Sequence, residues 1–241
     1  AKGNGLAQAF FIGGYDLSGD VGSIQRCACP RAQLDVTGIN QSAHHRVNGL
    51  ADGLIEFNTW FNDAAGQEHA ALKGLPTADV GVIYANRSTA GASAAGLIAK
   101  QVNYDWNRGA DGSLQGTVLA QGQGFALEWG EMLTAGLVTQ GVAGSTASVD
   151  NAASSANGVV GYQETILDTG SGTLLIEESS DNGGADAWTT KITFGVSATR
   201  SASRVSATGT VERYLRCTTT GGYKTFAVMV RRGTAQDDTP L

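Results

Sequence analysis

Glycine interrupts this chain at short intervals, occurring 34 times in 241 residues, whereas proline occurs 3 times. Because glycine adopts positive φ angles at little steric cost, this spacing favours tight turns between short elements. The runs between the glycines are rich in Val, Ile, Thr and aromatic residues, which favour strands. The chain is therefore predicted to be mainly β.

The charge of the chain is low and slightly acidic. Charged residues make up 16% of it and the formal net charge is −6. No run of Lys or Arg predicts a surface for phosphates, so tight nucleic-acid binding is not expected. The first residues lack a signal-peptide pattern, and no stretch approaches the ~18 apolar residues of a membrane span. We expect a protein made in the cytoplasm, with no membrane partner.

A change of composition divides the chain. Residues 141–158 read GVAGSTASVDNAASSANG, a composition typical of flexible linkers. We predict a β domain at residues 1–142, a flexible linker at 143–158, a smaller C-terminal β-sandwich domain at 159–233 and a C-terminal tail at 234–241. Few contacts are expected to cross the linker.

Period-two patterns predict the strands. Ile55, Phe57 and Phe61 alternate with Glu56 and Asn58, as in a half-buried strand. Other strands of the first part are predicted at 8–13, 33–39, 79–86 and in a long hairpin at 97–121. Strands of the second part are predicted at 159–167, 173–178, 188–196, 209–218 and 223–232. One helix is predicted at 62–74, with Asn62 or Asp63 as its cap and Gly74 at its end.

The cysteines and histidines include residue types that bind zinc. Cys27 and Cys29 are separated by one residue, fewer than structural zinc sites use, and His44 and His45 would point to opposite faces of a strand. No metal site is predicted. With Cys217 the cysteines are odd in number, and we expect all three to be reduced thiols.

Motifs for catalysis are incomplete. Ser93 lies in Gly91-Ala92-Ser93-Ala94-Ala95, which misses the last position of a nucleophile elbow, and Leu127 replaces the third glycine of a dinucleotide motif that begins at Gly122. Acidic residues are explained as turn formers, caps or solvated side chains, namely Asp16, Asp20, Asp105, Asp111, Glu128 and Glu131. We therefore predict no enzyme, with no catalytic, cofactor-binding or metal-binding residue.

Six segments of the first part resemble the major tail proteins of siphophages, especially those that infect actinobacteria. They are 12–21 (IGGYDLSGDV), 34–39 (LDVTGI), 49–53 (GLADG), 99–105 (AKQVNYD), 108–114 (RGADGSL) and 124–130 (GFALEWG). Their order and spacing agree with that family over roughly the first 140 residues. The second part resembles the added β-sandwich domains of many virion proteins.

This resemblance implies a tail-tube-type β-sandwich or barrel with one flanking helix. It also implies hexameric rings that stack into the DNA-conducting tube of a virion, with other tail proteins as partners and with DNA passing but not specifically bound. The segment 23–47 departs most from the family, because Cys27, Cys29, His44 and His45 are not features of it. The net negative charge agrees with a lumen that does not retain phosphates.

The hairpin at 97–121 is expected to build the channel wall. Ile98, Val102, Tyr104 and Val118 are expected on its apolar side, with Gln101, Asn103, Gln115, Thr117 and Gln121 on an uncharged polar side. A hairpin on any solvated surface would show the same pattern. Lys100 would attract phosphate, so we expect it to pair with a carboxylate such as Asp105 or Asp111, or to lie away from the lumen.

Two other functions fit the sequence. A carbohydrate-binding or host-adhesion protein would use the second part, with an aromatic groove near Trp188, Tyr214 or Tyr223. A capsid decoration protein would bind a shell and have no through-channel. Both alternatives are virion proteins.

Overall fold

The computed structural model describes residues 5–169, 172–195, 199–222 and 224–233. It is mainly β, as the glycine spacing predicts, with one short helix. The strands up to residue 140 are β1 (Ala9–Ile12), β2 (Tyr15–Asp16), β3 (Val21–Ala28), β4 (Arg31–Asp35), β5 (Arg46–Ala51), β6 (Leu54–Trp60), β7 (Val80–Ala85), β8 (Ser93–Gln101), β9 (Asp105–Arg108), β10 (Leu114–Gly122), β11 (Glu128–Met132) and β12 (Val138–Gln140). Those that follow are β13 (Gly144–Ser145), β14 (Val149–Asp150), β15 (Val159–Asp168), β16 (Leu174–Ser179), β17 (Thr189–Thr193), β18 (Ser201–Ala207), β19 (Tyr214–Thr219) and β20 (Lys224–Arg232).

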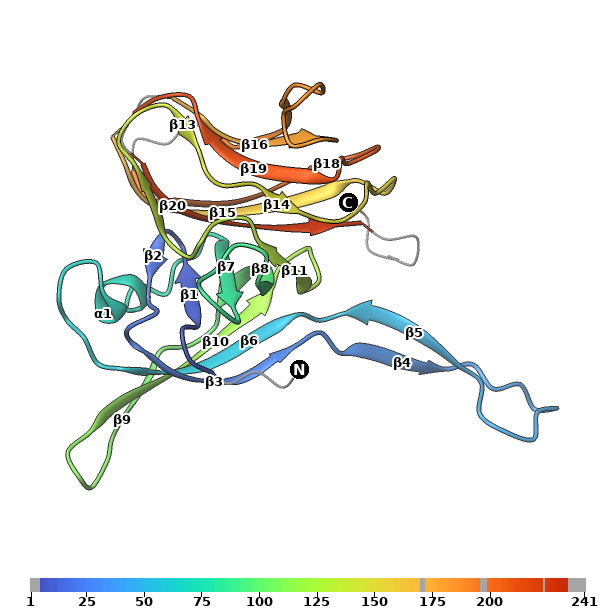
Figure 1. The fold of residues 1–241 in the computed structure, drawn as a ribbon. Coiled ribbons are helices and arrows are strands. Elements are labelled where there is room, and N and C mark those ends of the chain that lie inside the picture. The colour runs from blue at the N-terminus through green and yellow to red at the C-terminus, as the bar shows by residue number, and fades with distance from the viewer. Residues whose placement is uncertain (1–4, 170–171, 196–198, 223, 234–241) are drawn as a thin grey trace.

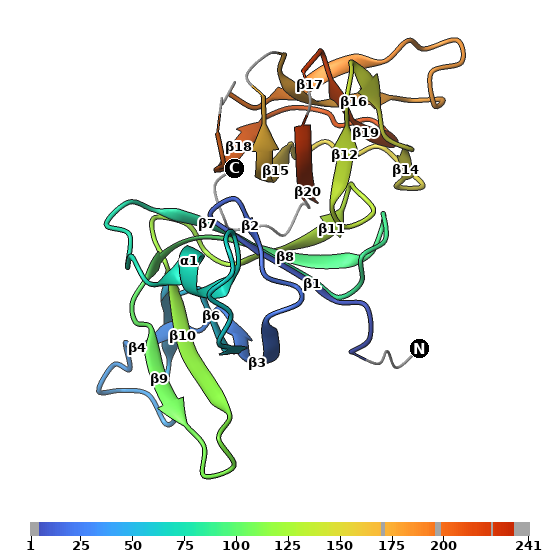
Figure 2. The same cartoon turned by 90° about the vertical axis from the view of Figure 1, so that its left-hand side faces the viewer.

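The largest sheet runs through both halves of the protein. It has thirteen strands, and its path β18-β15-β20-β11-β8-β10-β6-β3 does not close on itself. A five-stranded sheet, β13-β19-β16-β17 with β14, packs over strands β15 and β20 of the large sheet. The two layers form the upper part of Figure 1. Figure 2 shows the same layers from the side, with β7, β8 and β1 crossing below them.

Three apolar clusters hold these layers together. One lies within the first part, around Phe57 and Leu97, and another lies between the two sheets of the second part, around Ile176 and Phe226. The third draws on both parts, because Phe11, Ile83 and Met132 pack with Val160, Tyr162 and Met229. The core is therefore continuous from one half to the other.

The segment 143–158, predicted as a flexible linker, is built into the second sheet. Gly144 pairs with Thr219 through β13, Val149 pairs with Leu215 through β14, and the Val149 side chain is buried. The prediction that few contacts cross this segment is wrong, because β11 of the first part pairs with β20. Small polar residues suit edge strands and turns as well as linkers, so composition did not distinguish them. The boundaries at 142 and 158 stay predictions, and the tail 234–241 lies outside the described residues.

The helix α1 (Glu68–Leu72) is much shorter than the predicted 62–74. Gly66 has a φ of 81°, which is not helical, so the helix begins only after it. The N-cap residue Gln67 makes no side-chain capping hydrogen bond. Asn62 accepts a hydrogen bond from the Ala64 amide and so forms a turn instead. No helix in the described part of the chain is long and apolar enough to cross a membrane.

Candidate assembly surfaces and a polar groove

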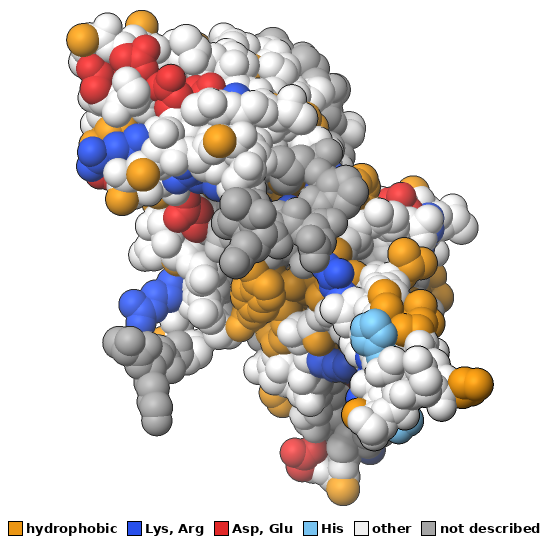
Figure 3. Space-filling view, turned by 90° about the vertical axis from the view of Figure 1, so that its right-hand side faces the viewer, with side chains coloured by type: hydrophobic (Ala, Val, Ile, Leu, Met, Phe, Trp, Pro, Cys, Tyr) orange, Lys and Arg blue, Asp and Glu red, His pale blue; other side chains and the backbone are white. Residues whose placement is uncertain are grey.

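Strands β4 and β5 form an arm that projects from the body of the protein (Figure 1). Among the described strands they pair only with each other, Leu34 opposite Val47 and Asp35 opposite Arg46. Large apolar side chains on the arm are exposed, namely Leu34 (53%), Val36 (49%), Ile39 (110%), Val47 (46%) and Leu50 (89%). Figure 3 shows hydrophobic side chains gathered on this projection beside its histidines. Since a lone two-stranded hairpin is marginal in water and exposed apolar patches mark contact sites, this arm is a candidate surface for a partner.

Polar contacts fix the geometry of the arm. Gln33 Nε2 donates to Asn48 Oδ1 at 2.6 Å, and His44 Nδ1 lies 2.8 Å from Asp35 Oδ2. The hydroxyl and amide of Thr37 both donate to the Asp35 carboxylate and lower its pKa. The bonds of Asp35 support the turn at the tip, and the bond of Gln33 joins the two strands.

The zinc-type residues are not gathered into one site. His44 is committed to Asp35 near the tip of the arm, whereas Cys27 lies in β3 at its base. Burial raises the pKa of Cys27 to about 11, and burial also raises the pKa of the enclosed Cys217 thiol. Within the described ranges, no group of three or more His, Cys, Asp or Glu side chains is placed to hold a metal ion.

The hairpin predicted at 97–121 is present but broken into three strands. β8 pairs with β10 through Gln101 and Ala120, and β9 pairs with β10 through Arg108 and Leu114. The predicted faces are wrong on the first strand: Gln101 is buried and donates to the Leu72 carbonyl at 2.7 Å, whereas Val102 is exposed. The return strand agrees with the prediction, because Thr117 and Gln121 lie on its more exposed side and Val118 is buried in the core.

The solvent side of β8, β10 and β6 is polar, and its charged side chains are Lys100 and Glu56. Lys100 Nζ lies 2.6 Å from Asp79, so the expected carboxylate partner exists but is neither Asp105 nor Asp111. Gln121 donates to Asp52 at 2.8 Å, and Thr117 donates to Asn58 at 3.2 Å. The lysine of this sheet face is therefore not a free cation.

An aromatic cluster at the base of the β9 hairpin was missed from the sequence. Trp106 packs edge-on against Phe61 and Tyr104, at centroid distances of 5.0 and 5.2 Å. The Tyr104 hydroxyl lies 2.8 Å from His69 Nδ1 and donates to Glu68 at 3.2 Å. Burial raises the pKa of Glu68. These contacts fasten α1 to the hairpin, and only the aromatic spacing in the sequence hinted at them.

Buried charges join the two halves. The Glu128 carboxylate accepts hydrogen bonds from Arg204 at 2.8 and 3.0 Å, from Arg231 at 2.8 Å and from the Tyr162 hydroxyl. All of these side chains are buried. Burial, followed by the charge of Glu128, raises the pKa of Tyr162. The sequence explained Glu128 as a turn former, a cap or a solvated side chain, and that explanation is wrong because strand pairing brings its partners from distant parts of the chain.

Glu164 is a second buried acid between the halves. Its Oε2 accepts the Gly14 amide at 2.6 Å, whereas its Oε1 has no hydrogen-bond partner among the described residues. Burial raises the pKa of Glu164 well above its ordinary value. A Cβ at Gly14 would lie 2.8 Å from the Thr165 carbonyl, and a Cβ at Gly81 would lie 2.7 Å from Glu164 Oε1, which explains why both positions are glycine.

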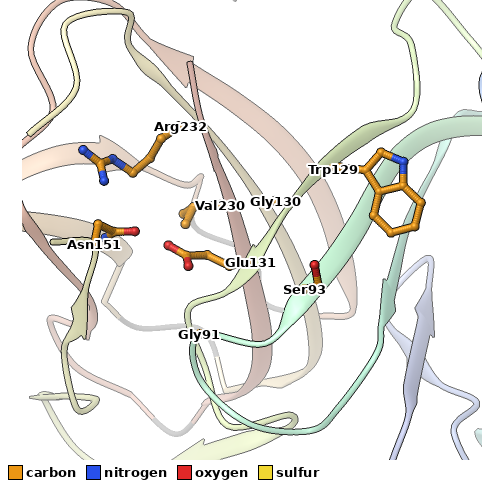
Figure 4. Close-up of a pocket in the computed structure, with 8 residues that line it drawn as sticks. All are labelled: Gly91, Ser93, Trp129, Gly130, Glu131, Asn151, Val230 and Arg232. Carbon is orange, nitrogen blue, oxygen red and sulfur yellow. The ribbon is translucent and has the colours of Figure 1, made fainter. Parts of the chain in front are cut away.

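A polar groove opens at the junction of β8, β11, β14 and β20. One hollow of about 330 Å³ is lined by Ser93, Trp129, Glu131, Asn151 and Arg232, and an adjoining hollow of about 440 Å³ shares Asn151 and Arg232. Figure 4 shows the Glu131 and Asn151 side chains directed into the same space, Arg232 beside them, and Trp129 on the far side of Ser93. Ser93 begins a strand and is not a nucleophile elbow, so its role is to line this groove.

The predicted aromatic groove of the second part is not open at Trp188. The Arg216 guanidinium lies 4.2 Å from the centre of the Trp188 ring, and a Cβ at Gly183 would lie 2.3 Å from the indole nitrogen. Arg213 similarly covers Tyr214 at 4.8 Å, and Tyr223 lies outside the described residues. Trp129, an exposed tryptophan of the first part, lines the polar groove described above.

Comparisons with known proteins give matches only among solved structures. No protein-family model matches the chain, and no curated protein sequence is detectably similar to it. The SPP1 Dit protein, described as a paradigm of the hub adsorption apparatus in phages that infect Gram-positive bacteria, aligns at a TM-score of 0.37 and 11% identity, covering 93% of this chain and 99% of that chain. A chain of the phage p2 baseplate in its activated conformation with Sr aligns at a TM-score of 0.36 and 9% identity, covering 94% of this chain and 99% of that chain. A chain of the same baseplate in its activated conformation with Ca aligns at a TM-score of 0.34 and 8% identity, covering 95% of this chain and 99% of that chain. TM-scores this low do not establish a shared fold.

Proposed function

We propose that the chain is a structural protein of a long-tailed phage, the subunit of a tail tube built from stacked hexameric rings. The observation that carries the proposal is the arm of β4 and β5, whose exposed apolar side chains are not covered by any described residue of the same copy. A subunit of a symmetric assembly would cover the arm with the next copy. The six segments that resemble siphophage major tail proteins support the same reading.

In this proposal the polar face of β8, β10 and β6 lines the lumen. Its lysine is paired with Asp79, and its other polar groups are amides and hydroxyls together with the Glu56 carboxylate. A wall with few free cations retains phosphates weakly, so DNA would pass through the lumen without specific binding. Other tail proteins would be the further partners, and the chain would act in the virion, after synthesis in the host cytoplasm, without enzymatic activity.

Sedimentation velocity over a concentration series tests the proposal. The full chain is expected to form hexamers or larger species, and the double variant Leu34→Ser, Val47→Ser to remain monomeric, because it removes the apolar pair of the arm. Leu167→Ser is the matched control, since Leu167 is a similarly exposed leucine on β15, outside the arm. Monomers of the unmodified chain at every concentration, or equal assembly of the arm variant, would overturn the proposal.

A further inference from the structure

Two residues that line the groove beside Trp129 each have a buried polar atom without a hydrogen-bond partner in the described part of the chain. Arg232 donates through Nη2 to the Ala153 carbonyl at 2.6 Å, but its buried Nε makes no hydrogen bond among the described residues. The buried Nδ2 of Asn151 is also without a partner there. Unsatisfied buried donors are rare in folded proteins and call for a ligand or a water.

Glu131 supplies the complementary acceptor. It stands opposite Ser93 on β8 and Val230 on β20, so it faces the same hollow as Arg232, two residues further along β20. Burial raises the pKa of Glu131, and the charge of Arg232 only partly offsets this. The hollow thus has donors on one wall, an acceptor on another and formal charges that sum to zero.

Trp129 adds a free aromatic face. Its side chain is 54% exposed, and no ring or guanidinium of the described residues stacks on it. Trp129 and Glu131 are two residues apart on β11, so both project from one face of the sheet. An exposed indole beside paired donors and acceptors is suited to a molecule with both apolar C–H faces and hydroxyl groups.

We propose that this groove binds a neutral oligosaccharide, with one sugar ring on Trp129 and hydroxyls of another between Glu131, Asn151 and Arg232. Sugar hydroxyls can donate to Glu131 and accept from Asn151 and Arg232. A carboxylate or phosphate ligand is less suited, because it cannot donate to Glu131 and its charge would be repelled by that carboxylate. The adjoining hollow is lined by Ser154, Ser155 and Asn157, and it lengthens the groove with further hydroxyl and amide groups. This inference does not depend on the tail-tube proposal.

A glycan microarray probed with the labelled full chain tests the inference. Binding to one or more neutral glycans is expected, and Trp129→Ala is expected to weaken it at least about tenfold, since stacking on an indole contributes on that order. Glu131→Gln keeps an acceptor oxygen and is expected to change binding less than Trp129→Ala. Calorimetric titration with the strongest glycan measures these ratios in solution.

Two tryptophan variants serve as controls. Trp60→Ala removes an indole of similar exposure on β6, and Trp188→Ala removes the indole covered by Arg216. Both are expected to bind as the unmodified chain does. The inference is overturned by an array with no neutral-glycan signal, by binding that survives Trp129→Ala, or by binding lost in Trp188→Ala. Loss of self-association in Trp129→Ala without any glycan binding would assign this groove to a subunit contact instead.

Discussion

The Glu128 carboxylate and the Arg204 guanidinium lie 76 positions apart in the chain and are joined by two hydrogen bonds, of 2.8 and 3.0 Å. Arg204 also stacks over Phe125 at 3.9 Å, so it holds the loop that precedes β11 as well as the carboxylate. Because Glu128 belongs to β11 and Arg204 to β18, this contact fastens the first part of the fold to the second.

Removing the Glu128 carboxylate should destabilise the whole protein. Glu128→Ala leaves Arg204 and Arg231 buried without their shared acceptor, a change that typically costs about 3–5 kcal/mol in the free energy of unfolding. Urea denaturation measures it. The control is Asp150→Ala, which breaks the exposed pair with Arg213 and is expected to leave the midpoint almost unchanged. If the two variants lowered the unfolding midpoint by similar amounts, the claim that the buried Glu128 contacts stabilise the fold would be contradicted.

Glu164 should make stability depend on pH. Because its pKa is raised in the folded state, the folded protein binds more protons than the unfolded chain above the ordinary glutamate pKa of about 4.3, and stability falls as pH rises through this window. Glu164→Gln keeps an acceptor for the Gly14 amide and removes this titration. The variant is expected to be more stable than the unmodified protein at neutral pH, with the difference shrinking toward pH 4. Equal pH slopes for the two proteins would refute the raised pKa.

Residues 1–142 alone should not fold cooperatively. Truncation removes β20 from beside β11, takes Val160, Tyr162 and Met229 out of the shared core, and leaves Glu128 without Arg204 and Arg231. Circular dichroism and thermal unfolding of the fragment give the answer. A sharp unfolding transition like that of the full chain would show that the first part is independent, as its sequence had indicated.

Cys27 and Cys217 should react more slowly than solvent-exposed thiols. With its pKa near 11, Cys27 is deprotonated roughly a hundredfold less at pH 8 than an ordinary cysteine, and Cys217 is fully buried. Iodoacetamide labelling followed by mass spectrometry should find Cys217 unmodified and Cys27 slow in the native protein, and both modified in urea. Rapid native labelling of Cys217 would contradict its placement in the core.

The sequence predicted what local patterns determine. The alternation at Ile55 and Phe57 placed β6 almost to the residue, because one face of that strand is buried and the other is polar. The run at 173–178 became β16, which alternates between buried and half-buried residues, and the run at 159–167 became β15, which is buried on both faces from Val159 to Thr165. The helix failed because Gly66 adopts a positive φ within a pattern that otherwise resembled a capped helix.

Contacts between distant residues could not be predicted in this way. Nothing near Glu128 in the sequence indicates that it is buried, since its partners Tyr162, Arg204 and Arg231 arrive from three later strands. The sequence predicts Gln101 on the polar, solvent-facing side of its strand, but Gln101 is buried and donates a hydrogen bond to the Leu72 carbonyl. The Trp129 groove likewise brings together Ser93, Glu131, Asn151 and Arg232 from separate parts of the chain. Their sequence positions do not indicate that they lie close together.

Cryo-electron microscopy of the assembled full chain tests the central claim most directly. The account predicts sixfold rings stacked around a through-channel, with the β4 and β5 arm of each copy covered by a neighbouring copy and the polar face of β8, β10 and β6 toward the lumen. Particles without a channel, or an assembly in which Leu34, Val47 and Leu50 of the arm remain exposed to solvent, would contradict it.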